Sequence, residues 1–304
     1  MLQRGYGGVV VGHVAVGNGV AGLVQRRFED ASRSYTAAVV GGGAPVHGGN
    51  AAGLVCIAID GGGQGLVPVA LGGAACAREV AAALDRYRMA GPDVRVHPGI
   101  LLAVDGGEAV VVEMRDDGTV GARSAEVGEA EDGGDDMDPT ARLRSLITRL
   151  RQVEPKPHEG AAPVAGLAAL LSTGEPPRLC FALGPPSCAV FVRHWPGLEV
   201  GPDEAATPEG APLARLAAAV AQLTGTDPDL RRGARERLDG AEAEALREGE
   251  AAERMAARMD ADTDDRGAAV RRLVAQTYSA GLAMQALEEL AVPAPPGSKP
   301  GPRL

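Results

Sequence analysis

Short apolar runs bounded by glycine dominate the first 125 residues of the chain. Those rich in β-branched residues predict strands, at residues 8–16, 34–42 and 53–60. A longer apolar stretch, 99–123, is interrupted by the turn sequences DGG and DG. Because such sequences form tight turns between strands, this stretch predicts a meander of three antiparallel strands.

Segments whose apolar residues have helical spacing alternate with these strands. This spacing predicts helices over 75–91, which ends at Gly91 and Pro92, and over 139–150. The alanine-rich segment 162–172 predicts another helix, and two strands are expected at 178–184 and 188–195. The glycine-rich sequence at 61–65 lacks the spacing of a phosphate-binding loop and is expected to be an ordinary loop.

After about residue 210 the pattern changes to helices rich in alanine, glutamate and arginine, expected at 212–224, 229–259 and 264–290. Two of them carry apolar stripes: Leu213, Leu216, Val220 and Leu223 on the first, and Val270, Leu273, Val274, Tyr278, Leu282 and Leu287 on the last. We expect these stripes to pack on one flank of the sheets, with formation of a homodimer as the alternative.

These elements predict an α+β chain of packed antiparallel sheets with helical layers. We expect a sheet-containing domain over 1–208, a helical C-terminal block over 209–291 and a disordered tail rich in proline and glycine over 292–304. The acidic run 126–138 is expected to be a solvated loop, because its carboxylates lack the spacing of a metal-binding loop.

Charge and composition exclude several classes of function. The formal net charge of -10 argues against nucleic acid and anionic membranes as partners. The four cysteines form no CxxC pair or disulfide pattern, and no apolar run reaches the length of a membrane span, so we expect a cytoplasmic protein. The five histidines lack HxxxH spacing, so we expect neither a metal nor a cofactor.

Asn50 stands among glycines in the sequence GGNAAGL, 48–54, at the entry to a predicted strand. Two interpretations are open. Asn50 is a turn residue, because Asn and Gly tolerate positive φ, or its side-chain amide is aimed at a ligand.

The order of several segments resembles the cysteine-dependent N-terminal-nucleophile (Ntn) amide hydrolases, in particular the dipeptidase/secernin-like, penicillin-acyltransferase and choloylglycine-hydrolase branches. The segments are VVVGH at 9–13, GGNAAGL at 48–54, AREVAAALDRY at 77–87, ILLAVDGGEAVVVEM at 100–114 and LCFALGPPSCAVFVRHWPG at 179–197. The resemblance covers residues 7 to 200 and implies an αββα sandwich of two antiparallel sheets between helical layers.

The resemblance also implies a chemistry. In these families an N-terminal cysteine thiolate attacks a linear amide, its own α-amine serves as the base, and an asparagine side chain helps to hold the oxyanion. Asn50 matches that asparagine, and Gly12, His13 and Gly49 are the candidate binding residues around it.

The chain departs from the family pattern at the nucleophile. Residues 1–8 contain no Cys, Ser or Thr, and Val14 and Val16 stand where the families have Asn and Asp. Cys188 is an alternative nucleophile, although no histidine is fixed beside it by the sequence, and an inert thiol is the simpler interpretation. Two functions therefore stay open: an amide hydrolase or acyltransferase acting on a peptide-like or acyl-amide small molecule, or a non-catalytic relative that binds such a ligand or pairs with a homologous partner.

Overall fold

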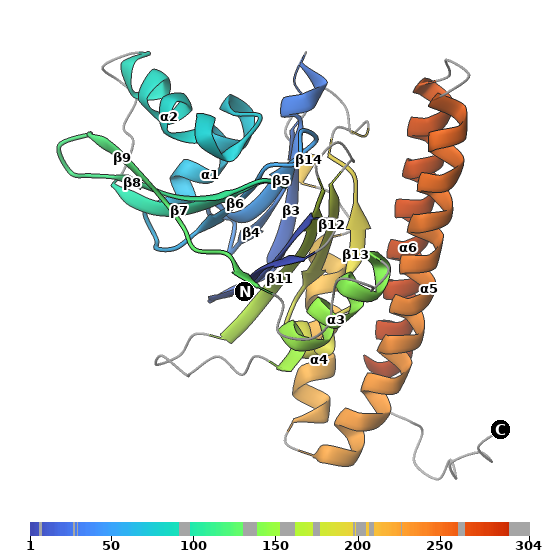
Figure 1. Cartoon of the computed structure of the whole chain (residues 1–304). Coiled ribbons are helices and arrows are strands. Elements are labelled where there is room, and N and C mark those ends of the chain that lie inside the picture. The colour runs from blue at the N-terminus through green and yellow to red at the C-terminus, as the bar shows by residue number, and fades with distance from the viewer. Residues whose placement is uncertain are drawn as a thin grey trace, which may run out of the picture.

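The computed structural model consists of two β-sheets and six α-helices in the part of the chain that it describes (Figure 1). The described residues are 1–5, 8–26, 28, 30–90, 98–129, 139–152, 162–172, 177–196, 198, 205–206, 210–225, 227–260 and 265–291. The predicted disordered tail and most of the acidic run lie outside these residues. Among the described helices, none is by itself long and apolar enough to cross a membrane.

One sheet has six strands, and neighbouring strands are antiparallel except for the parallel pair β1 and β10. In spatial order they are β10 (Gly128–Glu129), β1 (Leu2–Gly5), β2 (Gly8–Gly17), β11 (Ala162–Leu171), β12 (Arg178–Leu183) and β13 (Val192–His194). Strands β2 and β11 thus occupy the middle of this sheet, where both faces can be covered.

The other sheet has eight strands, all antiparallel to their neighbours. In spatial order they are β14 (Ala205–Ala206), β3 (Ala21–Arg26), β4 (Tyr35–Val40), β5 (Pro45–Asn50), β6 (Val55–Ala58), β7 (Gly99–Val104), β8 (Ala109–Met114) and β9 (Val120–Ser124). Strands β7 to β9 confirm the predicted meander.

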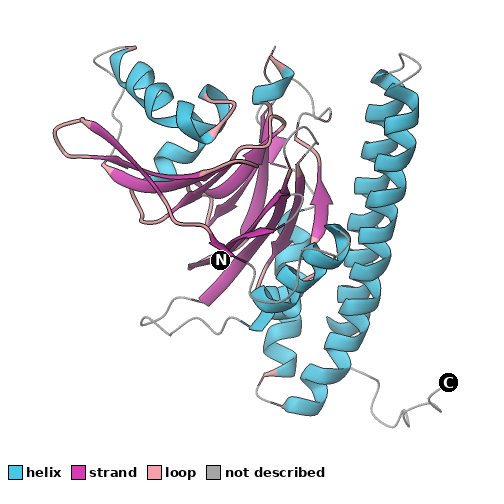
Figure 2. Ribbon diagram, in the orientation of Figure 1, coloured by secondary structure: helices cyan, strands magenta, loops and turns pink. Residues whose placement is uncertain are grey.

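The two sheets pack face to face, and helices cover their outer faces (Figure 2). Helices α1 (Gly63–Gly73) and α2 (Val80–Met89) lie on the eight-stranded sheet. Helix α3 (Pro139–Gln152) lies on β2 and β11 of the six-stranded sheet. The structure therefore confirms two packed sheets, antiparallel apart from one strand pair, with helices against them.

The C-terminal helices are α4 (Gly210–Thr224), α5 (Pro228–Asp260) and α6 (Asp265–Ala291), and their bounds agree with the predicted ones to within two residues. Leu213, Leu238 and Leu287 belong to the same hydrophobic cluster as both sheets. The helical block thus covers one flank of the sheets, as expected, and shares their core. The division at 208 and 209 stays a prediction.

For the first half of α6, the predicted packing of the apolar stripe is wrong, because these residues are exposed. Val270, Leu273, Val274 and Tyr278 are 52%, 37%, 58% and 48% exposed. The buried positions of α6 are mainly small, namely Ala268, Ala275, Ser279, Ala280 and Ala283. Small side chains let α5 and α6 approach closely, which turns the larger apolar residues outward. On α4, Leu213 and Val220 are buried and Leu216 is half-buried, whereas Leu223 is 49% exposed. Homodimer formation stays a prediction.

Two further predictions are wrong. The segment 162–172, predicted to be a helix, forms strand β11, which is buried on both faces between α3 and the other sheet. Burial on both faces removes the alternation that identifies a strand. The glycine-rich sequence 61–65 is not a loop throughout, because α1 begins at Gly63. Asp60 Oδ1 accepts the Gly63 N–H at 2.6 Å and so fixes the start of this helix.

The other expected elements are largely present. Strands β4 and β6 lie within their predicted runs, and β2 extends one residue beyond its own. Elements α2, α3 and β12 lie within or close to theirs. The predicted strand 188–195 is reduced to β13, preceded by a short 3₁₀ turn at Pro186–Cys188. Strands β1, β3 and β5 were not predicted, because they are short and interrupted by glycine or polar residues.

Candidate functional site

The layer between the sheets holds three of the five histidines. His13 of β2 and His47 of β5 face each other, with their Nδ1 atoms 2.9 Å apart and their ring centroids 5.1 Å apart. One ring must donate and the other accept, so this contact requires at least one neutral ring. Burial lowers the pKa of His13 to about 4 and that of His47 well below its ordinary value, so both rings are neutral at pH 7.

Aromatic contacts continue this layer across the six-stranded sheet. The His47 ring stacks on Phe181 of β12 at 6.0 Å, and Phe181 meets His194 of β13 edge-on at 5.6 Å. Burial lowers the pKa of His194 to about 4. His47 Nε2 and His194 Nδ1 are buried without a hydrogen-bond partner among the described residues. We call His13, His47 and His194 the inter-sheet histidines. Within the described residues no three His, Cys, Asp or Glu side chains form a group that could hold a metal.

Sequence reasoning missed this layer. His13, His47 and His194 come from three strands, so their meeting depends on sheet pairing and not on local spacing. His13 and His47 lie in or beside apolar strand sequence, where neighbouring residues are buried. This placement was the signal that could have indicated buried histidines.

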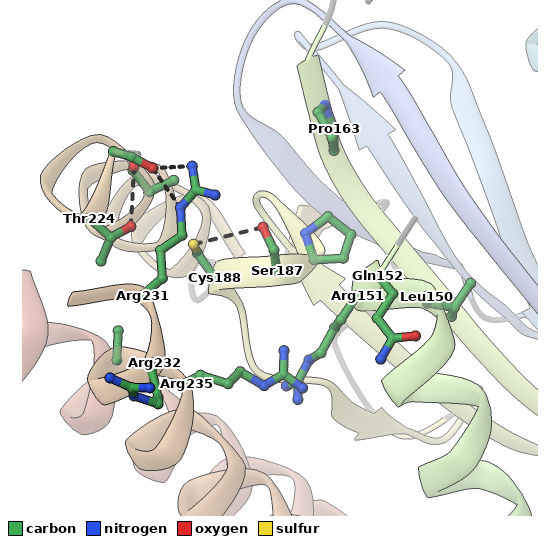
Figure 3. Close-up of a pocket in the computed structure, with 14 residues that line it drawn as sticks. Leu150, Arg151, Gln152, Pro163, Ser187, Cys188, Thr224, Arg231, Arg232 and Arg235 are labelled. Atoms are coloured by element: carbon green, nitrogen blue, oxygen red, sulfur yellow. Dashed lines mark hydrogen bonds between the residues drawn. The ribbon is translucent and has the colours of Figure 1, made fainter. Parts of the chain in front are cut away.

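The cysteines differ in their access to solvent. Cys56 and Cys180 are fully buried, and burial raises the pKa of Cys180 to about 12. Cys188 is half-buried in the 3₁₀ turn, where its Sγ lies 3.8 Å from Ser187 Oγ (Figure 3). Among the described residues, no histidine contacts Cys188.

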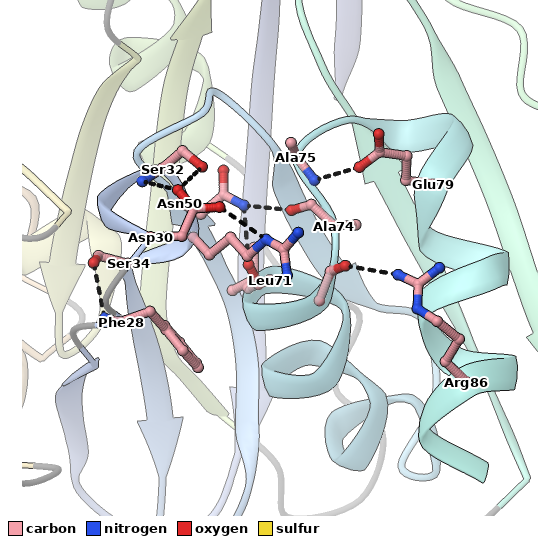
Figure 4. Close-up of polar contacts among 12 residues, drawn as sticks. Phe28, Asp30, Ser32, Ser34, Asn50, Leu71, Ala74, Ala75, Glu79 and Arg86 are labelled. Atoms are coloured by element: carbon pink, nitrogen blue, oxygen red, sulfur yellow. Dashed lines mark hydrogen bonds and ion pairs between the residues drawn. The ribbon is translucent and has the colours of Figure 1, made fainter. Parts of the chain in front are cut away.

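Asn50 lies at the end of β5 and is fully buried. Its Oδ1 accepts the N–H of Leu54 at 3.0 Å, and its Nδ2 donates to the carbonyls of Leu71 and Ala74 at 2.9 and 2.8 Å (Figure 4). These two carbonyls belong to the C-terminal end of α1, where backbone oxygens lack partners within the helix. Asn50 therefore fastens α1 to the β5–β6 turn.

This arrangement bears on both interpretations of Asn50. A primary amide has two N–H groups, and both are engaged by α1. The residue of this turn with positive φ is Gly53, at +92°. The oxyanion role stays a prediction, and it would require Asn50 to release the helix.

Gly12 and Gly49 are positions of close packing. A Cβ on Gly12 would meet Leu146 Cδ1 at 2.8 Å, so glycine lets α3 lie directly on β2. A Cβ on Gly49 would meet Leu179 Cδ1 at 2.6 Å, so glycine lets the two sheets approach. Gly12 and His13 are on opposite faces of β2, and the structure does not bring Gly12 to the inter-sheet side.

Met1 lies opposite Gly12 of the neighbouring strand β2. Its α-amine donates to the carbonyl of Gly12 at 2.7 Å, and the Gly12 N–H donates to the Met1 carbonyl at 2.8 Å. These bonds extend the pairing of β1 with β2 toward His13, so the first residue and one inter-sheet histidine lie at neighbouring positions of the sheet.

Comparison with solved structures shows distant structural likeness. No protein-family model matches the chain, and no curated protein sequence matches it. Among solved structures, penicillin V acylase from Agrobacterium tumefaciens is similar over 60% of this chain and 84% of its own, with a TM-score of 0.36 and 14% sequence identity. A likeness this weak carries no function across to this chain.

Proposed function

We propose that this chain has the αββα architecture of the Ntn amide hydrolases and binds a peptide-like or acyl-amide small molecule without cleaving it. Two features support the architecture: the order of the sequence segments that resemble these families, and the packing of two largely antiparallel sheets with helices on their outer faces.

The hydrogen bonding of Asn50 carries the non-catalytic part of this proposal. An oxyanion donor must have an N–H free to meet charge that develops in the transition state. Both side-chain N–H groups of Asn50 are bonded to carbonyls of α1, and the residue is 0% exposed. The side chain that the resemblance assigns to charge stabilisation is thus engaged in holding the fold together.

One observation favours a hydrolase as the second candidate. A general base must be unprotonated before the reaction, and the half-buried His13 is unprotonated at pH 7 because burial lowers its pKa to about 4. A base with so low a pKa is weak, which is why we place this function second.

Binding and turnover of the same compounds distinguish the two functions. The purified chain is incubated with N-acyl amino-acid amides and acyl p-nitroanilides, and its thermal midpoint and the release of amine are both measured. We expect at least one compound to raise the midpoint and none to be hydrolysed above the buffer rate. Hydrolysis that disappears in His13→Asn would establish the hydrolase instead. Failure of every compound to raise the midpoint would contradict this ligand class.

A further inference from the structure

A pocket of about 620 Å³ opens where α3, the 3₁₀ turn at Pro186–Cys188, the end of α4 and the start of α5 meet (Figure 3). This volume is typical of sites for small organic molecules. Its lining residues include Leu150, Arg151, Pro163, Pro186, Cys188, Ala221, Arg231, Arg232, Ala234 and Arg235. We call this cavity the arginine pocket.

The lining of the arginine pocket is strongly basic. Four arginines face it, and none of the described residues that line it is acidic. In a chain with 40 Asp and Glu against 30 Lys and Arg, such a concentration of one charge runs against the overall composition. A cavity lined by one sign of charge attracts ligands of the opposite sign.

The four arginines differ in how far the fold neutralises them. Arg151 is buried and bonded to Glu242 at 2.5 Å and to Asp239 at 2.7 Å, so it holds α3 against α5. Arg235 pairs with Asp239 at 2.9 Å, and Arg232 pairs with Asp229 on the surface.

Arg231 has no carboxylate partner among the described residues. Its Nε and Nη2 atoms both donate to the carbonyl of Gly225, at 2.6 Å for Nε. A guanidinium has five N–H groups, so three of them are not engaged by any described residue. Arg231 therefore keeps its charge and a planar donor fork for a ligand.

The position of these arginines is unfavourable for the helix that carries them. Arg231, Arg232 and Arg235 lie in the first two turns of α5, which begins at Pro228. Cations near a helix N-terminus oppose the helix dipole, and the like charges of Arg231 and Arg235 are four residues apart on one face. A bound anion would relieve both effects.

The rest of the lining of the arginine pocket combines apolar residues, Leu150, Pro163, Pro186, Ala221 and Ala234, with the polar side chains of Gln152, Ser187 and Thr224. A lining that combines arginines with apolar surface favours a ligand that has both an acidic group and an apolar part. We propose that this pocket binds a small amphipathic organic anion, a carboxylate or a phosphate monoester, with its acid group at Arg231 and Arg235 and its apolar part against Leu150. The inference is independent of the proposed amide-ligand function.

Cys188 reports on occupancy of the arginine pocket. Cys56 and Cys180 are buried, so in a Cys76→Ser background Cys188 is the accessible thiol. Its rate of alkylation by iodoacetamide is measured with octanoate, octyl phosphate, octanol or inorganic phosphate. We expect octanoate or octyl phosphate to slow alkylation at least fivefold, and octanol and inorganic phosphate to have little effect. The more effective of the two anions identifies the acid group. Equal protection by octanol, or no protection by either anion, would overturn the proposal.

A matched pair of variants tests the assigned arginines. Arg231→Gln/Arg235→Gln removes two charges from the pocket, and Arg247→Gln/Arg254→Gln removes two exposed charges from the same helix. We expect the anion concentration that gives half-protection to rise at least tenfold in the first variant and to stay within twofold in the second. An equal shift in both would show a non-specific charge effect and overturn the proposal. If the first variant fails to fold, Arg231→Gln alone is expected to shift half-protection at least threefold.

Discussion

Asn50 and Arg231 both donate side-chain hydrogen bonds to backbone carbonyls near a helix end, in two different regions of the molecule. They differ in how many of their N–H groups are engaged. Each donates to backbone carbonyls at or just past the end of a helix, α1 for Asn50 and α4 for Arg231. Asn50 is fully buried, and both N–H groups of its side chain are engaged. Arg231 is exposed and has three N–H groups that no described residue engages. Arg231 can therefore donate to a ligand as it stands, whereas Asn50 would first have to release α1.

The largest expected effect on stability comes from the inter-sheet histidines. His47 and His194 are buried like Asn50, but each keeps one ring nitrogen without a hydrogen-bond partner among the described residues. The folded-state pKa values of the inter-sheet histidines lie below the unfolded value of 6.5, so the unfolded chain binds more protons in acid. The stability that they contribute is complete above pH 6.5 and falls as the pH drops toward 4. A lowering from 6.5 to about 4 corresponds to roughly 3 kcal/mol for each of His13 and His194.

Urea unfolding between pH 7 and pH 4 measures this loss. In His194→Phe the loss of unfolding free energy over this range should be smaller than in the wild type by roughly 3 kcal/mol. An identical pH dependence in the two proteins would show that His194 does not charge on unfolding as described.

Replacement of Asn50 should have an effect of similar size on stability. Asn50→Ala removes three buried hydrogen bonds and leaves two carbonyls of α1 unbonded, so unfolding free energy should fall by about 3 kcal/mol. Asn18→Ala, at the other asparagine of the chain, changes an exposed side chain and should stay within about 0.5 kcal/mol. A loss below about 1 kcal/mol in Asn50→Ala would contradict the structural role.

Gly49 and Gly65 offer a smaller test of close packing. Gly49→Ala forces a Cβ against Leu179 and should destabilise the chain by about 1–3 kcal/mol. Gly65 is exposed in α1 with no atom within 4 Å of an added Cβ, so Gly65→Ala should stabilise by about 0.4–1 kcal/mol. Chemical unfolding of both variants checks the opposite signs. Effects of the same sign would contradict this account of the sheet-to-sheet approach.

Replacement of Arg231 should have the smallest effect on stability. Arg231→Gln loses contacts to the Gly225 carbonyl but removes a cation from the first turn of α5, and these changes offset each other. Unfolding free energy should therefore change by less than about 0.5 kcal/mol. A loss above about 2 kcal/mol, measured by urea unfolding, would show that the fold itself depends on Arg231 as it does on Asn50.

Local patterns predicted those parts of the fold that depend on local sequence. The meander of β7 to β9 and the bounds of α4, α5 and α6 follow from turn sequences and helical periodicity. Strand β11 was predicted to be a helix because an alanine-rich strand buried on both faces loses its alternation.

Contacts between distant segments could not be predicted in this way. Asn50 bonds to carbonyls 21 and 24 residues further along the chain, and His13 meets His47 across two sheets. The arginine pocket joins Arg151 of α3 to Arg231 and Arg235 of α5. The sequence could single out Asn50, but its partners become known only when α1 is in place.

Hydrogen exchange of the two asparagine side chains tests the central claim, that the fold engages the carboxamide of Asn50. Asn18 and Asn50 are the only asparagines, so selective ¹⁵N labelling of this residue type gives two side-chain NH₂ groups, with the exposed Asn18 as internal reference. We predict that the Asn50 protons exchange at least about a thousandfold more slowly than those of Asn18, because exchange requires α1 to open. Equally fast exchange of both groups would contradict the account and leave the Asn50 amide free to act on a ligand.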